Sequence, residues 1–172
     1  MQQIFLDVGC GKRKQSNALG LDIAKLDGVN IVCNLEDGLP FKDNSIDRIY
    51  TSHFLEHIKN LVLMMEEIYR VCKPGAIVEI IVPYWKTSLA FQDPTHKCFF
   101  TEETFNYFTK DPKRKCPRYS DYGFKCDFNI KKNELSYNRM FAWLKYIPLN
   151  ILLHPSNTVS ELKVILEVNK KV

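Results

Sequence analysis

The chain lacks several features that would place it in a special class of protein. No apolar run approaches the roughly 18–20 residues that a bilayer-spanning helix needs, and there are no internal repeats and no low-complexity segments. The 24 Lys+Arg exceed the 20 Asp+Glu by a formal net charge of only +4, which does not require a nucleic-acid partner. With 45% hydrophobic residues, the composition excludes a disordered, coiled-coil or collagen-like chain. We therefore expect residues 1–172 to form a single globular domain.

The six cysteines form no C-x-x-C pair, and residues 1–3 do not resemble the start of a secretory signal. We therefore expect a reducing cytoplasm and free thiols. One group of residues invites comparison with a zinc site: His96, Cys98, Cys116 and Cys126. Because their spacing matches no common zinc pattern, we expect no metal.

Short apolar runs alternate with loops and one clear helix. The helix is expected over residues 60–72, where apolar residues recur with helical spacing. Strands are expected over residues 3–8, 18–23, 29–33, 46–51 and 76–83, with an edge-side antiparallel strand at 161–168. Weaker patterns indicate a helix at 101–109, a strand at 124–130 and two short helices within 138–153. This order predicts an α/β sheet of mixed direction that binds ligands at the carboxyl ends of its strands.

A loop containing Gly9 and Gly11 follows the first strand. Lys14 replaces the third glycine of the dinucleotide fingerprint, and only eight residues separate Gly11 from Gly20. That length is too short for the usual helix whose N-terminus binds a pyrophosphate. The basic residues 12–14 are interpreted as a solvated loop, with attraction of phosphate as the alternative.

Three polar side chains near the strand ends favour a different ligand. Asp7 would repel phosphate and favour an ammonium group. Asp22 can accept two hydrogen bonds from ribose hydroxyls, and the amide of Asn34 can pair with an adenine edge. A ligand with a cationic head, a ribose and a base, but no phosphate, fits S-adenosylmethionine.

Five short motifs stand in the order and near the spacing found in one protein family. They occupy residues 6–11, 20–22, 39–47, 54–57 and 71–75. Over about residues 4–110 the sequence resembles the class I S-adenosylmethionine-dependent methyltransferases, especially the small-molecule group. The resemblance implies an α/β, Rossmann-like sheet of seven strands in the order 3-2-1-4-5-7-6, flanked by helices. Strand 7, at residues 161–168, would be antiparallel.

The resemblance also implies a set of cofactor-binding residues. Asp7, Gly9 and Gly11 would surround the methionine part, and Asp22 would hold the ribose. Ile23, Asn34 and Leu35 would contact the adenine. Ser52 and His53 would lie near the amine and the transferred methyl group. The helix after the glycine loop and the helices that precede the first strand in the family are expected to be absent. The site would then be open, and a homodimer is one way to close it.

Methyl transfer requires an aligned acceptor, and a general base only where the acceptor carries a proton that it cannot lose unaided. His53 and His96 are the candidate catalytic residues, and Tyr84, Trp85 and His96 are candidates for binding the acceptor. For these residues the alternative is packing within a loop or at a strand end. His57 is interpreted as a structural histidine that hydrogen-bonds a loop.

The absence of one motif reduces the number of possible methyl acceptors. Residues 51–54 read TSHF, where amino-group methyltransferases of adenine or glutamine carry Asn-Pro-Pro-Tyr or Asp-Pro-Pro-Tyr. The basic residues 110–118 suggest RNA binding, with a solvated loop as the alternative. The apolar stretch 141–153 either covers the sheet or is a membrane-surface or dimer element. We predict a methyltransferase for a small-molecule or sugar-like acceptor; the alternatives are RNA methylation and a non-catalytic, cofactor-binding scaffold.

Overall fold

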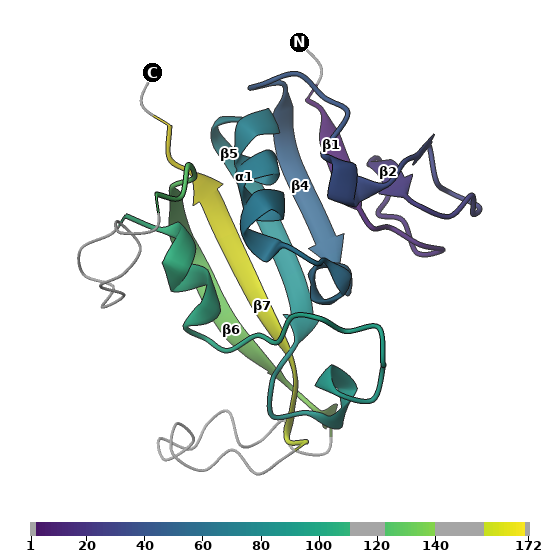
Figure 1. The fold of residues 1–172 in the computed structure, drawn as a ribbon, viewed down its shortest axis with the longest axis vertical. Coiled ribbons are helices and arrows are strands. Elements are labelled where there is room, and N and C mark those ends of the chain that lie inside the picture. The colour runs from purple at the N-terminus through teal and green to yellow at the C-terminus, as the bar shows by residue number, and fades with distance from the viewer. Residues whose placement is uncertain (1–2, 111–122, 140–156, 171–172) are drawn as a thin grey trace.

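The computed structural model describes residues 3–110, 123–139 and 157–170, and its centre is one mixed sheet (Figure 1). The strand order is β3-β2-β1-β4-β5-β7-β6. The strands are β1 Phe5–Val8, β2 Leu19–Asp22, β3 Ile31–Val32, β4 Ile46–Ser52, β5 Cys72–Pro83, β6 Phe128–Tyr137 and β7 Val159–Val168. β1 to β5 pair in parallel, whereas β7 is antiparallel to both β5 and β6. The predicted Rossmann-like fold, including its strand order, is confirmed.

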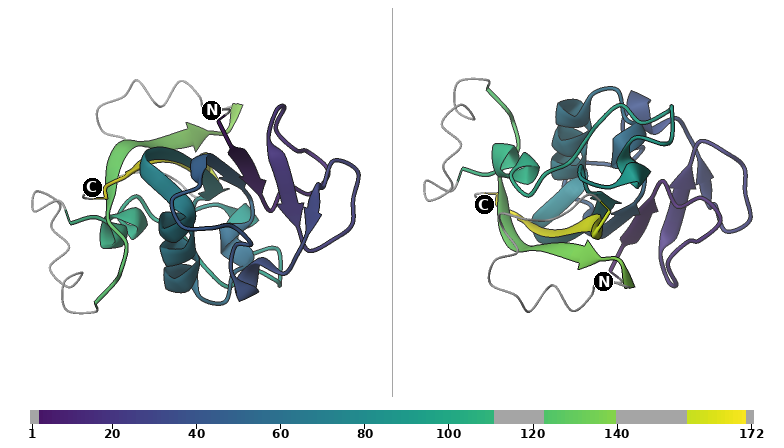
Figure 2. Two further views of the ribbon diagram at one scale, coloured as in Figure 1. Left: turned by 90° about the horizontal axis from the view of Figure 1, so that it is seen from above. Right: turned by 90° about the horizontal axis from the view of Figure 1, so that it is seen from below.

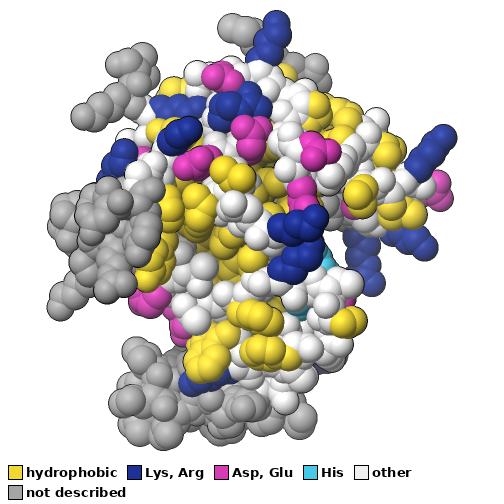
Figure 3. Space-filling view, viewed as in Figure 1, with side chains coloured by type: hydrophobic (Ala, Val, Ile, Leu, Met, Phe, Trp, Pro, Cys, Tyr) yellow, Lys and Arg dark blue, Asp and Glu magenta, His cyan; other side chains and the backbone are white. Residues whose placement is uncertain are grey.

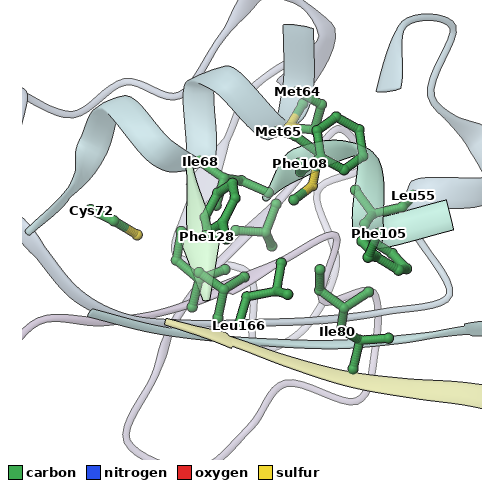
Figure 4. Packing of buried hydrophobic residues seen from close by; sticks show 14 of the residues in the cluster. Leu55, Met64, Met65, Ile68, Cys72, Ile80, Phe105, Phe108, Phe128 and Leu166 are labelled. Atoms are coloured by element: carbon green, nitrogen blue, oxygen red, sulfur yellow. The ribbon is translucent and has the colours of Figure 1, made fainter. Parts of the chain in front are cut away.

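Helix α1, Leu61–Val71, covers one face of this sheet (Figures 1 and 2). Asn60 caps its N-terminus, because the Asn60 side-chain oxygen accepts a hydrogen bond from the Leu63 N–H at 3.1 Å. The apolar stripe of α1 is buried against the sheet and against the 3₁₀ helix η4, Thr104–Phe108. Figure 4 shows side chains of α1 and η4 converging on those of the strands. The other 3₁₀ helices are η1 Leu35–Asp37, η2 Leu55–His57 and η3 Ser88–Ala90.

Two expected elements differ from those in the structure: the strand that follows α1 and the helix at residues 101–109. β5 begins at Cys72, directly after the helix, rather than at residue 76. Cys72 pairs with Ile46 before a register shift leads to the pair Arg48 and Ile77. Residues 73–75, the end of the last motif, therefore form the irregular start of a strand. The expected helix at 101–109 is only η4, because the Thr101 N–H bonds to the Thr104 hydroxyl at 2.9 Å and holds the chain in a turn.

The C-terminal strands also differ from expectation. β6 covers residues 128–137 rather than 124–130, since much of this edge strand is polar and shows no apolar pattern. The alternation of residues 161–168 alone indicated an edge-side strand, but β7 lies between β5 and β6, as the strand order implied by the resemblance has it. Its alternate charged side chains are paired across strands, as in the contact of Lys163 with Glu79 at 2.5 Å.

Some expectations fall outside the described residues: residues 111–118 of the basic loop, with Cys116, the apolar stretch 141–153, and residues 140–153 of the two expected short helices. The five described cysteines are free. None of the helices within the described ranges combines the length and the apolar character needed to cross a membrane.

Candidate active site

The loop after β1 brings the ends of β1 and β2 together. The Gly9 and Cys10 N–H groups donate to the Leu21 carbonyl at 2.9 and 3.1 Å, and the Gly11 N–H donates to Asp22 Oδ2 at 2.9 Å. Gly9 and Gly11 have φ of +71° and +51°, values that favour glycine. Residues 9–18 contain only turns, so the expected absence of a helix here is confirmed.

Two adjoining pockets lie along this edge of the sheet. The first, of about 490 Å³, is called the Asp22 pocket, and the second, of about 690 Å³, is called the Asp7 pocket. Gly9 and His53 line both pockets, so the two adjoin, and together they are called the trough. All nine residues that the sequence suggested for the cofactor line it: Asp22, Ile23, Asn34 and Leu35 in the Asp22 pocket, Asp7, Gly11 and Ser52 in the Asp7 pocket, and Gly9 and His53 in both.

Asp7 gives its pocket a buried acidic group. Its side chain accepts a hydrogen bond from the Gln15 N–H at 2.7 Å, and the residue is only 2% exposed. Burial raises the pKa of the Asp7 carboxyl above its ordinary value, because water is not there to stabilise the charge. A cationic ligand group would restore that stabilisation.

The Asp22 pocket joins a hydrogen-bonding wall to an apolar one. Gly11 and Ala24 each donate a backbone N–H to a different oxygen of Asp22, both at 2.9 Å. This fixes the carboxylate and leaves each oxygen a further lone pair. Ile23 is 69% exposed, so it presents an apolar surface that the core does not use. Asn34 is already engaged as the N-cap of η1, accepting from the Glu36 N–H and donating to the Asp37 carboxylate.

His53, at the end of β4, is held between two carboxylates. Its Nε2 lies 2.8 Å from Glu161 Oε1, and its Nδ1 lies 3.3 Å from Glu56 Oε1. The Glu161 carboxylate, followed by that of Glu56, raises the pKa of His53 to about 9. The ring is therefore protonated at neutral pH, and the expected role of His53 as a proton acceptor does not fit this arrangement.

The other two described histidines pack against each other, with ring centroids 4.8 Å apart. His57 lines the Asp22 pocket, and its Nδ1 lies 2.9 Å from Thr95 Oγ1, which fits the expected structural role. His96 bonds through Nδ1 to the Ala90 carbonyl at 2.9 Å, and its side chain is 8% exposed. His96 is not among the residues that line either pocket, so the structure does not bring it to the expected acceptor position.

The aromatic residues after β5 also lie apart from the trough. Tyr84 is 2% exposed, and its hydroxyl donates to Glu102 at 2.9 Å. Burial and the Glu102 carboxylate raise the pKa of Tyr84 to about 12. The ring of Trp85 packs edge-on against Tyr84, and neither residue lines the two pockets. These contacts match the packing alternative rather than an acceptor wall.

Sequence reasoning missed several residues of the trough. Glu161 reaches it from β7, a position that no local pattern indicates. Phe54 lies against Gly9, and Lys97 comes from the loop after η3. Of these three residues, Phe54 alone could have been predicted from the sequence, because it belongs to the motif at residues 54–57.

Comparison with known proteins gives a consistent result. Residues 6–80 match the family model of a methyltransferase domain. The 24-methylenesterol C-methyltransferase 2 of Arabidopsis thaliana is 31% identical in an alignment 115 residues long that covers 52% of this chain and 31% of that protein. The chain therefore spans about a third of the length of this curated relative.

Solved structures share the fold at low sequence identity. An S-adenosylmethionine-dependent methyltransferase from Archaeoglobus fulgidus superposes with a TM-score of 0.63 and 17% sequence identity. The match covers 96% of this chain and 86% of the Archaeoglobus chain. A chain from the complex between the Haloferax volcanii Trm112 methyltransferase activator and a methyltransferase has a TM-score of 0.63 and 14% sequence identity. That match covers 98% of this chain and 83% of the chain from that complex.

The sheet order and the solved neighbours define a Rossmann-like fold that this chain shares with methyltransferases. The family match over residues 6–80 covers the region that carries the motifs by which the sequence resembles the class I S-adenosylmethionine-dependent methyltransferases, and the fold agrees with that resemblance.

Proposed function

We propose that this protein binds S-adenosylmethionine in the trough and transfers its methyl group to a small-molecule or sugar-like acceptor. The observation that carries the proposal is the convergence of all nine expected residues on two adjoining pockets. The cofactor supplies an electrophilic methyl group on a sulfonium. The protein residues bind and orient the reactants and exclude water.

The chemistry of the trough fits the parts of the cofactor. The fixed Asp22 carboxylate can accept from both ribose hydroxyls, and the exposed Ile23 offers an apolar surface to a base. Buried Asp7 favours the ammonium group. A Cβ at Gly11 would meet nothing within 4 Å, so the backbone there is open to a ligand. Asn34 keeps a lone pair for the adenine, because its capping bond uses only one.

The acceptor side is framed by His53 and Glu161 in the Asp7 pocket. Glu161 is ionised, since the hydrogen bond from His53 lowers the pKa of its carboxyl. It can accept a hydrogen bond from an acceptor hydroxyl and so orient the oxygen, which supports a sugar-like acceptor. Protonated His53 keeps Glu161 in position and adds a positive charge to the trough.

On the face shown in Figure 3, basic side chains stand among acidic ones and form no continuous patch over the described residues. Protein–RNA contacts depend on such clusters. The described residues on this face therefore offer RNA no such cluster.

The first test is binding of S-adenosylmethionine and its demethylated product by calorimetry. Asp22→Asn should lose about 1.5–3 kcal/mol of binding free energy, roughly 10- to 150-fold in affinity. Asp27→Asn is the matched control, because Asp27 is an exposed carboxylate outside the trough. Absence of binding by the wild-type protein would refute the proposal.

The second test is transfer of labelled methyl from the cofactor to a panel of sugars, phenols, amines and RNA. We expect label in hydroxylated small molecules. Label in RNA alone would support the RNA alternative. Cofactor binding without transfer to any component of a cell extract would support the non-catalytic scaffold.

A further inference from the structure

A buried carboxylate beside the trough lacks a hydrogen-bond partner, and its ion-pair contact is with His53. Glu56 is 1% exposed, and neither of its oxygens has a hydrogen-bond partner among the described residues. His53 lies 3.3 Å from Oε1 without hydrogen-bond geometry. A buried, unsatisfied carboxylate is costly, so a further positive or donating group is expected against it.

Two imidazoles stand next to this carboxylate. Glu56, His57 and His96 each offer one potential ligand atom, and these atoms all lie within 4.8 Å of one another. Asp93 adds negative charge, with its Oδ2 3.9 Å from His96 Nε2. The three residues come from η2 and from the loop after η3, which lies against η2.

The hydrogen bonds around the rings fix which nitrogen carries the proton. Thr95 donates its only hydroxyl proton to Asp93 Oδ1 at 2.7 Å, so it accepts from the Nδ1–H of His57. The Ala90 carbonyl can only accept, so His96 also carries its proton on Nδ1. With the proton on Nδ1, each ring can offer a metal ion the lone pair of its Nε2.

We propose that Glu56, His57 and His96 bind a divalent transition-metal ion of the Zn²⁺ type. Two imidazole nitrogens and one carboxylate are a ligand set that such ions favour, and ligating histidines usually donate their other N–H to a carbonyl or hydroxyl. Here Ala90 and Thr95 are those acceptors. The Glu56 oxygens, which accept no hydrogen bond among the described residues, supply the negative charge.

The ion would link two segments that line the Asp22 pocket, η2 and the loop after η3. Lys97 and Cys98 already donate their N–H groups to the Glu56 carbonyl at 2.7 and 3.0 Å. Both His57 and Lys97 line that pocket. A metal between η2 and the loop would hold the two together, a structural role that does not depend on the proposed methyl transfer.

The test is titration of chelator-treated, full-length protein with Co²⁺, followed by visible absorption, and with Zn²⁺ against a chromophoric chelator. We expect one equivalent to bind, with no thiolate-to-cobalt absorption band. His57→Asn and His96→Asn should each weaken binding about 10-fold or more. Zn²⁺ should also raise the melting temperature of the wild-type protein.

Two further variants separate the possible outcomes. Glu56→Gln removes the charge but keeps the shape, so it should stay folded by circular dichroism while losing the metal. Cys98→Ser should bind as the wild type does, because the Cys98 thiol donates to the Ile58 carbonyl at 3.3 Å. Loss of binding in Cys98→Ser would point to a thiolate site instead. If the protein binds no metal saturably, the proposal is overturned, and a water molecule bridging these residues would be the explanation.

Discussion

Gly9 combines two constraints that can be measured separately. Its φ is +71°, and a Cβ there would lie 2.5 Å from Phe54. Gly9→Ala should cost about 1–2 kcal/mol for the backbone and about 1–3 kcal/mol more for the clash. Gly75→Ala is the matched control, since its φ is +77° but nothing lies within 4 Å. Urea unfolding should show a larger loss for Gly9→Ala, and equal losses would contradict the clash.

Ile23 should matter for binding and not for stability. Because it is 69% exposed and lines the Asp22 pocket, Ile23→Ala should leave the free energy of unfolding unchanged. Its affinity for S-adenosylmethionine should fall by about 1 kcal/mol, roughly fivefold. Val32→Ala, at an exposed valine outside both pockets, is the calorimetric control. An equal effect of both substitutions would argue against an adenine beside Ile23.

At the residue scale, sequence reasoning reached the groups that follow a strand within a recognisable motif. Asp7 and Asp22 are such groups, and their side chains face the trough. It did not reach Glu161, because its partner His53 is 108 residues away and only the sheet topology joins them. It could not assign the protonation of His53 for the same reason.

At the element scale, the buried face of α1 should dominate its contribution to stability. Ile68 is fully buried, so Ile68→Ala should cost about 2–5 kcal/mol. Leu63, on the same helix, is 58% exposed. Leu63→Ala should stay within about 0.5 kcal/mol. Chemical denaturation of the two variants checks the assignment, and similar losses would mean that the helix faces are misplaced.

The end of α1 should also make stability depend on pH. Two hydrogen bonds from the Arg70 guanidinium, both at 2.8 Å, lower the pKa of Glu67 below its ordinary value of 4.5. This stabilisation is present above pH 4.5 and is lost as the pH falls through the lowered folded-state pKa. Glu67→Gln should therefore be less stable than the wild type at pH 7, with a smaller fall towards pH 3. Parallel pH profiles of unfolding free energy would contradict this.

Elements with a clear apolar period were predictable, whereas those set by local hydrogen bonds were not. α1 shows its stripe in the sequence. η4 is short because the Thr101 and Thr104 bond replaces a helical turn. β6 shows no apolar pattern because it is a largely polar edge strand.

At the scale of the whole molecule, strand order is not encoded in any local pattern. The alternation in residues 161–168 indicated a strand with one polar face, and an edge position was the simplest interpretation. β6 covers that edge, and β7 is interior. The correct order came from the family resemblance, carried by motifs at residues 6–75.

The central claim is that one trough along the strand ends holds the whole cofactor. A crystal structure with the demethylated product, S-adenosylhomocysteine, tests it most directly. We predict the adenine against Ile23, both ribose hydroxyls on Asp22 and the amine at Asp7. A product bound elsewhere, or in the reverse orientation, would contradict the account.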